Sequence, residues 1–171
     1  MRERSHLTFV LGGARSGKST YAEKLTAGFP APWRYVATAQ AFDEEMRERI
    51  AQHRARRGEG WLTVEAPLDL AAALAEAPKR QPVLVDCLTL WLSNRMLAGH
   101  DVEAESDRLA AVLATPRGPW FVVSNEVGLG LVPDNALGRR FRDAQGRLNR
   151  QVAEAADRVV LMVAGLPMQV K

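Results

Sequence analysis

Cysteine, lysine and long apolar runs are scarce in this chain of 171 residues. Cys87 is the only cysteine, so an internal disulfide and a zinc site built from cysteines are both excluded. No apolar run approaches the roughly 20 residues that cross a bilayer. Residues 1–6 also lack the apolar stretch of a signal peptide. We therefore expect a cytoplasmic protein with no membrane span, built as one domain over residues 1–171.

Lysine contributes only four of the 23 basic side chains, and arginine supplies the rest. The net charge of +3 is unevenly distributed, because residues 1–57 and 133–171 are basic and the middle of the chain is acidic. Clustered arginine favours phosphorylated ligands. A sequence pI near 9.4 also permits nucleic-acid binding. No recognisable RNA- or DNA-binding motif accompanies the charge, so we expect no nucleic-acid partner.

One of the few lysines, Lys18, lies in a segment that matches the phosphate-binding pattern G-x-x-x-x-G-K-[ST]. In this pattern, glycines let backbone N–H groups converge on phosphate oxygens, the lysine acts as a point charge, and the last hydroxyl reaches Mg²⁺. An apolar run at 7–11 precedes the segment, and a helical pattern at 19–27 follows it. The sequence therefore predicts a nucleotide-phosphate site on Gly12, Gly13, Ala14, Arg15, Ser16, Gly17, Lys18 and Ser19.

Short apolar runs alternate with helical patterns along the chain. The predicted strands are 7–11, 35–37, 83–86, 121–124 and 159–163, and the predicted helices are 19–27, 41–56, 68–77, 89–98, 103–114 and 134–156. This alternation is typical of an α/β fold with a mainly parallel central sheet and helices on both faces. We therefore predict a single-domain P-loop nucleotide-binding fold, whose ligands bind at the carboxyl ends of the strands.

Asp86 ends the apolar run Val83-Leu-Val-Asp86. An acid in this position beside a phosphate-binding loop can hold Mg²⁺, which prefers oxygen ligands. Together with Ser19, Asp86 is therefore a candidate magnesium ligand. Its neighbour Cys87 fits a small buried core residue better than a nucleophile.

His53 lies in the predicted helix 41–56, where Phe42, Met46 and Ile50 would share its face. Arginines surround it at positions 47, 49, 54, 56 and 57. The pattern alone favours a half-buried histidine with the arginines on a solvated face. The alternative is a nucleophilic imidazole in an arginine cluster that binds polyphosphate, where neighbouring cations disfavour the imidazolium form.

The stretch from Ser124 to Asp134 follows a predicted strand and contains two glycines and a proline. It holds few polar and many apolar residues, which indicates an ordered functional loop. Pro133 and Asp134 are expected to open the long helix 134–156, whose arginines suit a solvated basic face over an apolar core stripe.

Several of these segments together resemble the bifunctional adenosylcobinamide kinase/adenosylcobinamide-phosphate guanylyltransferases of cobalamin biosynthesis. The resemblance rests on residues 12–19, Tyr-Val-Ala-Thr-Ala at 35–39, the segment 43–54 around His53, and Val-Asp-Cys-Leu-Thr at 85–89. Its most specific part is Asn-Glu-Val-Gly-Leu-Gly-Leu-Val-Pro-Asp-Asn at 125–135, followed by residues 140–149. It covers the chain from about residue 7 onward. At Arg150 the chain departs from it, because glutamine is expected there.

The resemblance implies phosphorylation of adenosylcobinamide with ATP or GTP, and then transfer of GMP from GTP to the new phosphate with release of pyrophosphate. It makes His53 the residue that carries the guanylyl group, with Lys18 as the second catalytic residue. It also implies a homotrimer with a corrinoid substrate. Beyond the phosphate loop and Asp86, it places nucleotide contacts on Ala37, Thr38, Ala39, Arg54, Ala55, Arg56, Arg57 and Glu65.

Two other interpretations remain open on the residues themselves. An unrelated P-loop small-molecule kinase would make His53 structural. A nucleotide-regulated nucleic-acid-binding protein would use the arginine-rich faces instead.

Overall fold

The computed structural model describes residues 6–171, apart from the side chain of Arg49. The expectation about the first residues of the chain therefore lies mostly outside the described part, as does the place of Arg49 in the predicted arginine cluster. The strands are β1 (His6–Gly12), β2 (Trp33–Ala37), β3 (Trp61–Glu65), β4 (Val83–Asp86), β5 (Pro119–Asn125), β6 (Arg158–Val163) and β7 (Leu166–Gln169). The helices are α1 (Lys18–Ala27), α2 (Glu44–Arg56), α3 (Leu70–Ala75), α4 (Leu88–Leu97), α5 (Val102–Leu113) and α6 (Ala136–Ala155).

The strands form one seven-stranded sheet in the order β3-β2-β4-β5-β1-β6-β7. Strands β1 to β6 pair in parallel, and only β7 runs antiparallel to its neighbour β6. The predicted mainly parallel sheet is therefore confirmed. Because parallel strands end at the same edge, the segments that follow β1, β2, β4 and β5 are brought to one side of the sheet.

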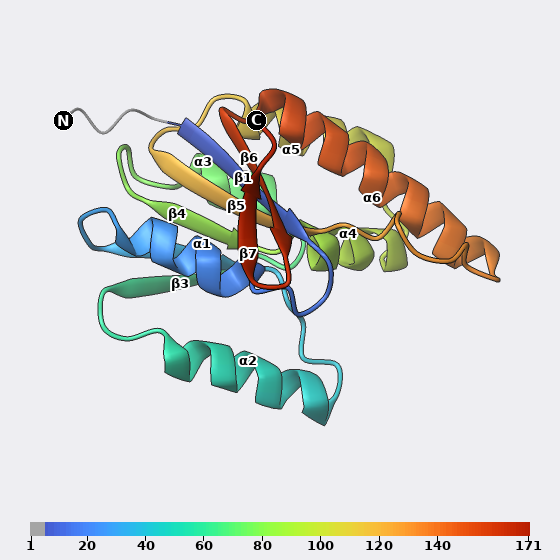
Figure 1. Ribbon diagram of the computed structural model, residues 1–171, viewed down its shortest axis with the longest axis horizontal. Helices are drawn as coiled ribbons and strands as arrows, with labels where there is room; N and C mark the ends of the chain where they lie inside the picture. The colour runs from blue at the N-terminus through green and yellow to red at the C-terminus, as the bar shows by residue number, and fades with distance from the viewer. Residues whose placement is uncertain (1–5) are drawn as a thin grey trace.

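Helices cover both faces of this sheet, as predicted (Figure 1). Successive strand residues point to opposite faces. In β1, for example, Phe9 packs in the core cluster with α3 to α6, and Val10 packs in the cluster with α1. Both residues are fully buried. The strands thus read as continuous apolar runs because each of their faces lies under helices.

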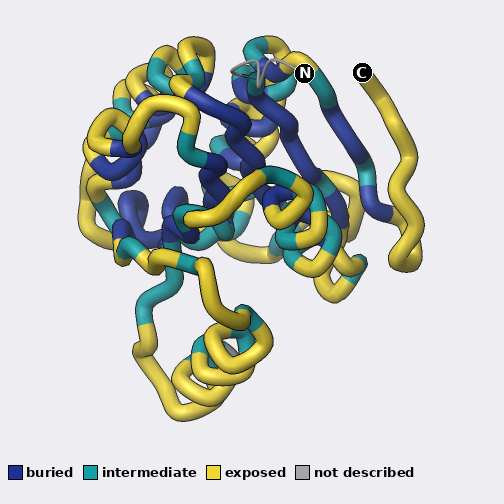
Figure 2. Tube along the Cα trace, turned by 90° about the vertical axis from the view of Figure 1, so that its left-hand side faces the viewer, coloured by how far each residue is buried: buried dark blue, intermediate teal, exposed yellow. Residues whose placement is uncertain are grey.

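Helix α2 stands apart from these two layers (Figure 2), and none of its described residues is buried. Asp43 caps its N-terminus, where the carboxylate accepts a hydrogen bond from the backbone N–H of Met46 at 2.8 Å. The prediction that Phe42 lies in this helix was wrong, because Asp43 is the N-cap and the helix begins at Glu44, after Phe42. Phe42 is 75% exposed.

The predicted sheet lacked β3 and β7, which are its two outermost strands. Both are largely exposed, so an apolar run did not mark them. The long helix α6 also begins later than predicted, because Asn135 and not Asp134 caps it by accepting from the N–H of Gly138 at 2.7 Å. Within residues 6–171, no helix is both long enough and apolar enough to cross a membrane.

Candidate functional site

The phosphate-loop segment, residues 12–19, joins the end of β1 to the start of α1. A Cβ added to Gly12 would lie 2.5 Å from Ser16 Oγ and 2.9 Å from the carbonyl oxygen of Met162 on β6. Gly17 adopts a φ of +88° as the N-cap of α1, a conformation that other residues rarely take. The shape of the loop therefore requires glycine at both of these positions.

Lys18 is held against the loop that precedes it. Its ammonium group donates to the carbonyl oxygen of Gly13 and to Ser16 Oγ, the latter at 3.4 Å. Ser16 Oγ itself donates to the same Gly13 oxygen at 2.8 Å. The residue is only 8% exposed, so a buried positive charge stands at the N-terminus of α1, where the helix dipole also favours anions. Ser19 follows in the first turn of that helix.

Two other strand ends hold the loop in place. The N–H of Glu126, just after β5, donates to the carbonyl oxygen of Gly12 at 3.0 Å. The N–H of Gly165, in the turn between β6 and β7, donates to the carbonyl oxygen of Ser16 at 3.1 Å. The second support was not predicted, because its turn exists only if β7 does. The available signal in the sequence was Gly165, a residue type that favours turns; in the structure both Gly165 and Ala164 have positive φ.

Asp86 ends β4 and pairs with Ala37 at the end of β2. The hydroxyl of Tyr35 donates to Asp86 Oδ2 at 3.1 Å. Burial raises the pKa of Tyr35, and the negative charge of Asp86 raises it further. The phenol therefore stays protonated and orients the carboxylate. The run of residues around Tyr35 gave no signal for this contact, which joins positions far apart in the sequence.

Thr38 locks the ends of β2 and β4 together. Its hydroxyl donates to the carbonyl oxygen of Cys87 at 2.6 Å and accepts from the N–H of Cys87 at 2.8 Å. Cys87 is buried, which confirms that it is a core residue. Burial, and then the charge of Asp86, raises the pKa of its thiol to about 11, so it is not a thiolate at neutral pH.

His53 lies on α2 and is partly buried. Met46 and Ile50 are the other partly buried residues among those described in this helix, which confirms that the three share a face. Arg57, the C-cap residue of α2, follows His53 by one turn. His53 thus lies on the side of α2 that is turned toward the rest of the molecule.

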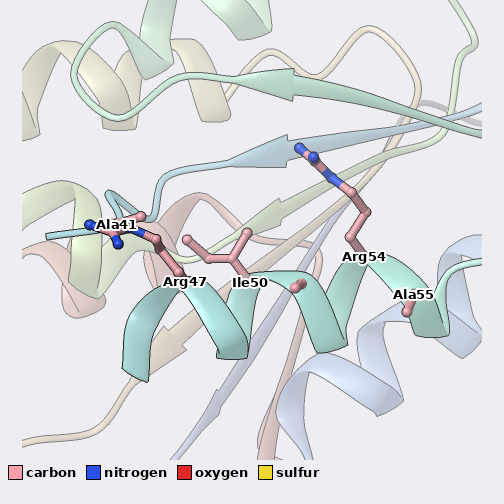
Figure 3. Close-up of a pocket in the computed structure, with 6 residues that line it drawn as sticks. Ala41, Arg47, Ile50, Arg54 and Ala55 are labelled. Carbon is pink, nitrogen blue, oxygen red and sulfur yellow. The ribbon is translucent and has the colours of Figure 1, made fainter. Parts of the chain in front are cut away.

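An open cleft of about 430 Å³ lies along the same helix (Figure 3). Arg47, Ile50 and Arg54 project into it from α2, as Figure 3 shows, and Ala41, Ala51 and Ala55 complete its lining. Arg54 also pairs with Glu65 at the end of β3, with 3.4 Å between Nη2 and Oε1. Both side chains are exposed, so this ion pair contributes little to stability and leaves both groups accessible to a ligand.

The C-terminus of α2 is anchored to the phosphate-loop helix through Glu23 of α1. Arg56 Nε and Nη2 each donate to a different oxygen of Glu23, at 3.1 and 3.0 Å. Arg57 Nη1 lies 3.9 Å from the same carboxylate, and its guanidinium stacks 3.5 Å above the ring of Tyr35. Only 5% of the Arg57 side chain is exposed. The predicted site residues therefore fall into two groups, the strand ends and α2, which Glu23 and Tyr35 connect.

The groups at the strand ends are those of an anion site beside oxygen ligands that suit a hard cation. The loop provides backbone N–H groups and an ammonium, and Ser19 and Asp86 provide the hydroxyl and carboxylate oxygens that Mg²⁺ prefers. Among residues 6–171, no three His, Cys, Asp or Glu side chains gather into a metal-binding cluster. Such a cluster is not required where the phosphates of a nucleotide supply the other ligands.

A family model described as cobinamide kinase/cobinamide phosphate guanyltransferase matches residues 8–170. The chain is 50% identical to the bifunctional adenosylcobalamin biosynthesis protein CobP of Pseudomonas aeruginosa over 165 residues, which is 95% of each chain. It is 38% identical to the bifunctional adenosylcobalamin biosynthesis protein CobU of Escherichia coli over 181 aligned residues, covering 96% of this chain and 99% of that protein.

The fold also resembles that of a solved structure, the flagellar accessory protein FlaH of Methanocaldococcus jannaschii. The TM-score is 0.57 at 15% sequence identity, and the match covers 98% of this chain and 79% of that chain. At this identity the similarity concerns the fold alone. Together with the loop and the parallel sheet, it agrees with the predicted P-loop fold class.

Proposed function

Because this chain belongs to the cobinamide kinase/cobinamide phosphate guanyltransferase family, we propose that it catalyses both reactions of that name. It phosphorylates adenosylcobinamide with ATP or GTP, and it then transfers GMP from GTP to adenosylcobinamide phosphate. The observation that carries the proposal is the anchoring of the His53 helix to the phosphate-loop helix through Arg56 and Glu23. This contact ties the helix that carries a candidate nucleophile to the helix that follows the phosphate loop.

In the first reaction the loop binds the triphosphate through its backbone N–H groups and the Lys18 ammonium. The hydroxyl oxygen of the substrate attacks the γ-phosphorus, and the bond from that phosphorus to the β-phosphate oxygen breaks. Lys18 stabilises the charge that develops on the phosphate oxygens. Ser19 and Asp86 would hold Mg²⁺, which when bound neutralises the charge of the β- and γ-phosphates. Tyr35 keeps the Asp86 carboxylate oriented for that role.

In the second reaction a ring nitrogen of His53 attacks the α-phosphorus of GTP, and pyrophosphate leaves. The phosphate of the corrinoid substrate then attacks the same phosphorus, and the phosphorus–nitrogen bond to His53 breaks. Splitting the transfer in this way is typical of nucleophilic catalysis. The remaining nucleotide contacts fall on Ala37, Thr38, Ala39, Arg54, Ala55, Arg56, Arg57 and Glu65.

The position of the Arg57 side chain indicates which of its groups can contact the nucleotide. Because its guanidinium is buried between Tyr35 and Glu23, its side chain holds the end of α2 in place and its backbone is left to meet the nucleotide. Arg54 and Glu65 are exposed at the cleft, so they are better placed to meet a ligand with their side chains.

Exposed apolar residues support the proposed homotrimer. Leu129, Leu131 and Val132, in the loop after β5, are 86%, 96% and 66% exposed, and Leu137, in the first turn of α6, is 53% exposed. Side chains of this size on one surface favour burial against a second copy. We place the enzyme in the cytoplasm, where both nucleotides are available.

The experiment that tests this proposal measures whether the γ-phosphate and the α-phosphate of GTP are each transferred to the corrinoid. The protein is incubated with adenosylcobinamide, Mg²⁺ and GTP labelled at the γ- or the α-phosphate, and the corrinoids are separated by chromatography. We expect γ-label in a first product and α-label in a second. Lys18→Ala should abolish both, and Lys24→Ala, which alters an exposed lysine of the same helix, should abolish neither. A wild-type protein that passes neither label to the corrinoid would refute the proposal.

A further inference from the structure

A second acidic residue, Glu126, lies at the phosphate-loop edge of the sheet, beside Asp86. Strand β5 lies between β1 and β4, so its carboxyl end lies between the phosphate loop and Asp86. In the sheet register, Gly12 pairs with Asn125, and Asp86 pairs with Val123. Glu126 comes next after β5. On the other side of β1, strand β6 ends at Val163, and the turn residues Ala164 and Gly165 follow it; none of the three side chains can ionise.

The backbone at this point is held by three different elements. The N–H of Glu126 donates to the carbonyl oxygen of Gly12 at 3.0 Å. The N–H of Asn125 donates to Thr89 Oγ1 on α4 at 2.8 Å, and the carbonyl oxygen of Asn125 accepts from Asn149 Nδ2 on α6 at 3.0 Å. The position of Glu126 relative to the phosphate loop is therefore fixed.

A buried polar network stands behind these bonds. Ser124 Oγ donates to Asn149 Oδ1 at 2.7 Å, and Gln145 Nε2 lies 3.0 Å from the first and 2.9 Å from the second. Ser124 and Gln145 are fully buried, and Gln145 Oε1 has no hydrogen-bond partner among the described residues. An unpartnered buried oxygen costs free energy that an apolar side chain would not. The network is better explained by its effect on the end of β5 than by stability.

The carboxylate of Glu126 is also positioned. Its Oε1 accepts from the backbone N–H of Gly128 at 2.6 Å, which ties the side chain to the first turn of the loop after β5. The residue is partly exposed and thus within reach of a substrate. Asp86, the other acid beside this edge, already accepts from Tyr35 and is the candidate magnesium ligand. Glu126 is therefore not needed as a magnesium ligand.

We propose that Glu126 is the general base of the phosphoryl-transfer step, a role that rests on the proposed kinase activity. As the substrate hydroxyl oxygen bonds to the γ-phosphorus, the Glu126 carboxylate takes the hydroxyl proton. The bond between the γ-phosphorus and the bridging oxygen breaks, and the nucleoside diphosphate leaves. A base in this position serves only the first reaction, because the imidazole of His53 and the phosphate of the second substrate attack without a hydroxyl proton to remove.

The experiment separates the two reactions in Glu126→Gln. With γ-labelled GTP and adenosylcobinamide, we expect kcat to fall about 10²-fold or more with KM nearly unchanged. Glu126→Asp should recover part of the loss. The control Asp134→Asn removes an exposed acid of the same loop and should keep wild-type kcat. Labelling of the enzyme by α-labelled GTP should stay at the wild-type level in all three variants.

Three results would overturn the role of Glu126. The first is a kcat for Glu126→Gln within a few-fold of the wild type. The second is an equal loss of phosphoryl transfer and α-labelling, which would show a structural effect on the loop. The third is a wild-type enzyme that accepts the α-label and never transfers the γ-phosphate. That result removes the kinase half of the proposed function and the base with it, whereas the first two leave the proposed function intact.

Discussion

Replacing Gly12 by alanine tests how closely the phosphate loop is packed. The new Cβ would lie 2.5 Å from Ser16 Oγ and 2.9 Å from the carbonyl oxygen of Met162. Ser16 could rotate away, but it would lose its bond to Gly13. The Met162 oxygen belongs to β6, which is paired with β1 at this residue, so the backbone itself must shift. Overpacking of this kind costs roughly 1–3 kcal/mol of the free energy of unfolding.

The matched control is Gly13→Ala, since a Cβ at Gly13 would meet no atom within 4 Å. Its free energy of unfolding should stay within about 0.5 kcal/mol of the wild type. Urea denaturation followed by circular dichroism measures both variants. The thermal shift produced by GTP should be much smaller for Gly12→Ala, because movement of the loop misaligns the N–H groups that bind phosphate. A Gly12→Ala protein as stable as Gly13→Ala, with an undiminished GTP shift, would refute this account of the loop.

Three further predictions concern the contacts around the site. Glu23→Gln should lower the rate at which α-labelled GTP labels the enzyme several-fold, without much loss of stability, because it weakens the anchoring of α2. Glu44→Gln, at the exposed start of α2, should leave this labelling rate unchanged, and an equal rate in both variants would contradict the anchoring. Tyr35→Phe keeps the ring but removes the hydroxyl that donates to Asp86, so the Mg²⁺ concentration for half-maximal phosphoryl transfer should rise at least about 10-fold. An unchanged Mg²⁺ requirement would contradict the role of Tyr35 in orienting Asp86. The folded structure raises the pKa of the Cys87 thiol from 9.0 to about 11, so the unfolded protein loses this proton at a lower pH than the folded protein does. The free energy of unfolding should therefore fall between pH 9 and 11, by about 2 kcal/mol at most. Urea titrations should show a shallower decline for Cys87→Ala, and an equal decline would contradict the shift.

Local patterns were enough to predict the elements that carry the phosphate site. The apolar run before Gly12 and the helix after Ser19 lie within one residue of their predicted ends, because a buried strand and a helix N-terminus each have a signal of their own. Strands β3 and β7 were missed, since edge strands need no continuous apolar run. The pattern also placed Phe42 in α2, where Asp43 capped the helix one residue later.

Contacts between distant positions could not be predicted from these patterns. The bond between Tyr35 and Asp86 joins residues 51 positions apart, and that between Gly12 and Glu126 depends on β5 lying beside β1. Periodicity gives the face of a helix or strand, but it does not give the order of strands in a sheet. For this reason His53 remained ambiguous on its own pattern, and the place of Glu126 between the phosphate loop and Asp86 followed only from the order of the strands.

The most direct test of the central claim is to locate the guanylyl group on the protein. The enzyme is incubated with GTP and Mg²⁺ without corrinoid, denatured under alkaline conditions that preserve a phosphorus–nitrogen bond, digested, and analysed by mass spectrometry. We predict a GMP adduct on His53 that is absent from His53→Ala, present in the exposed-histidine control His100→Ala, and lost when adenosylcobinamide phosphate is added. An adduct on another residue, or full transfer of GMP by His53→Ala, would contradict the assignment of His53 as the nucleophile.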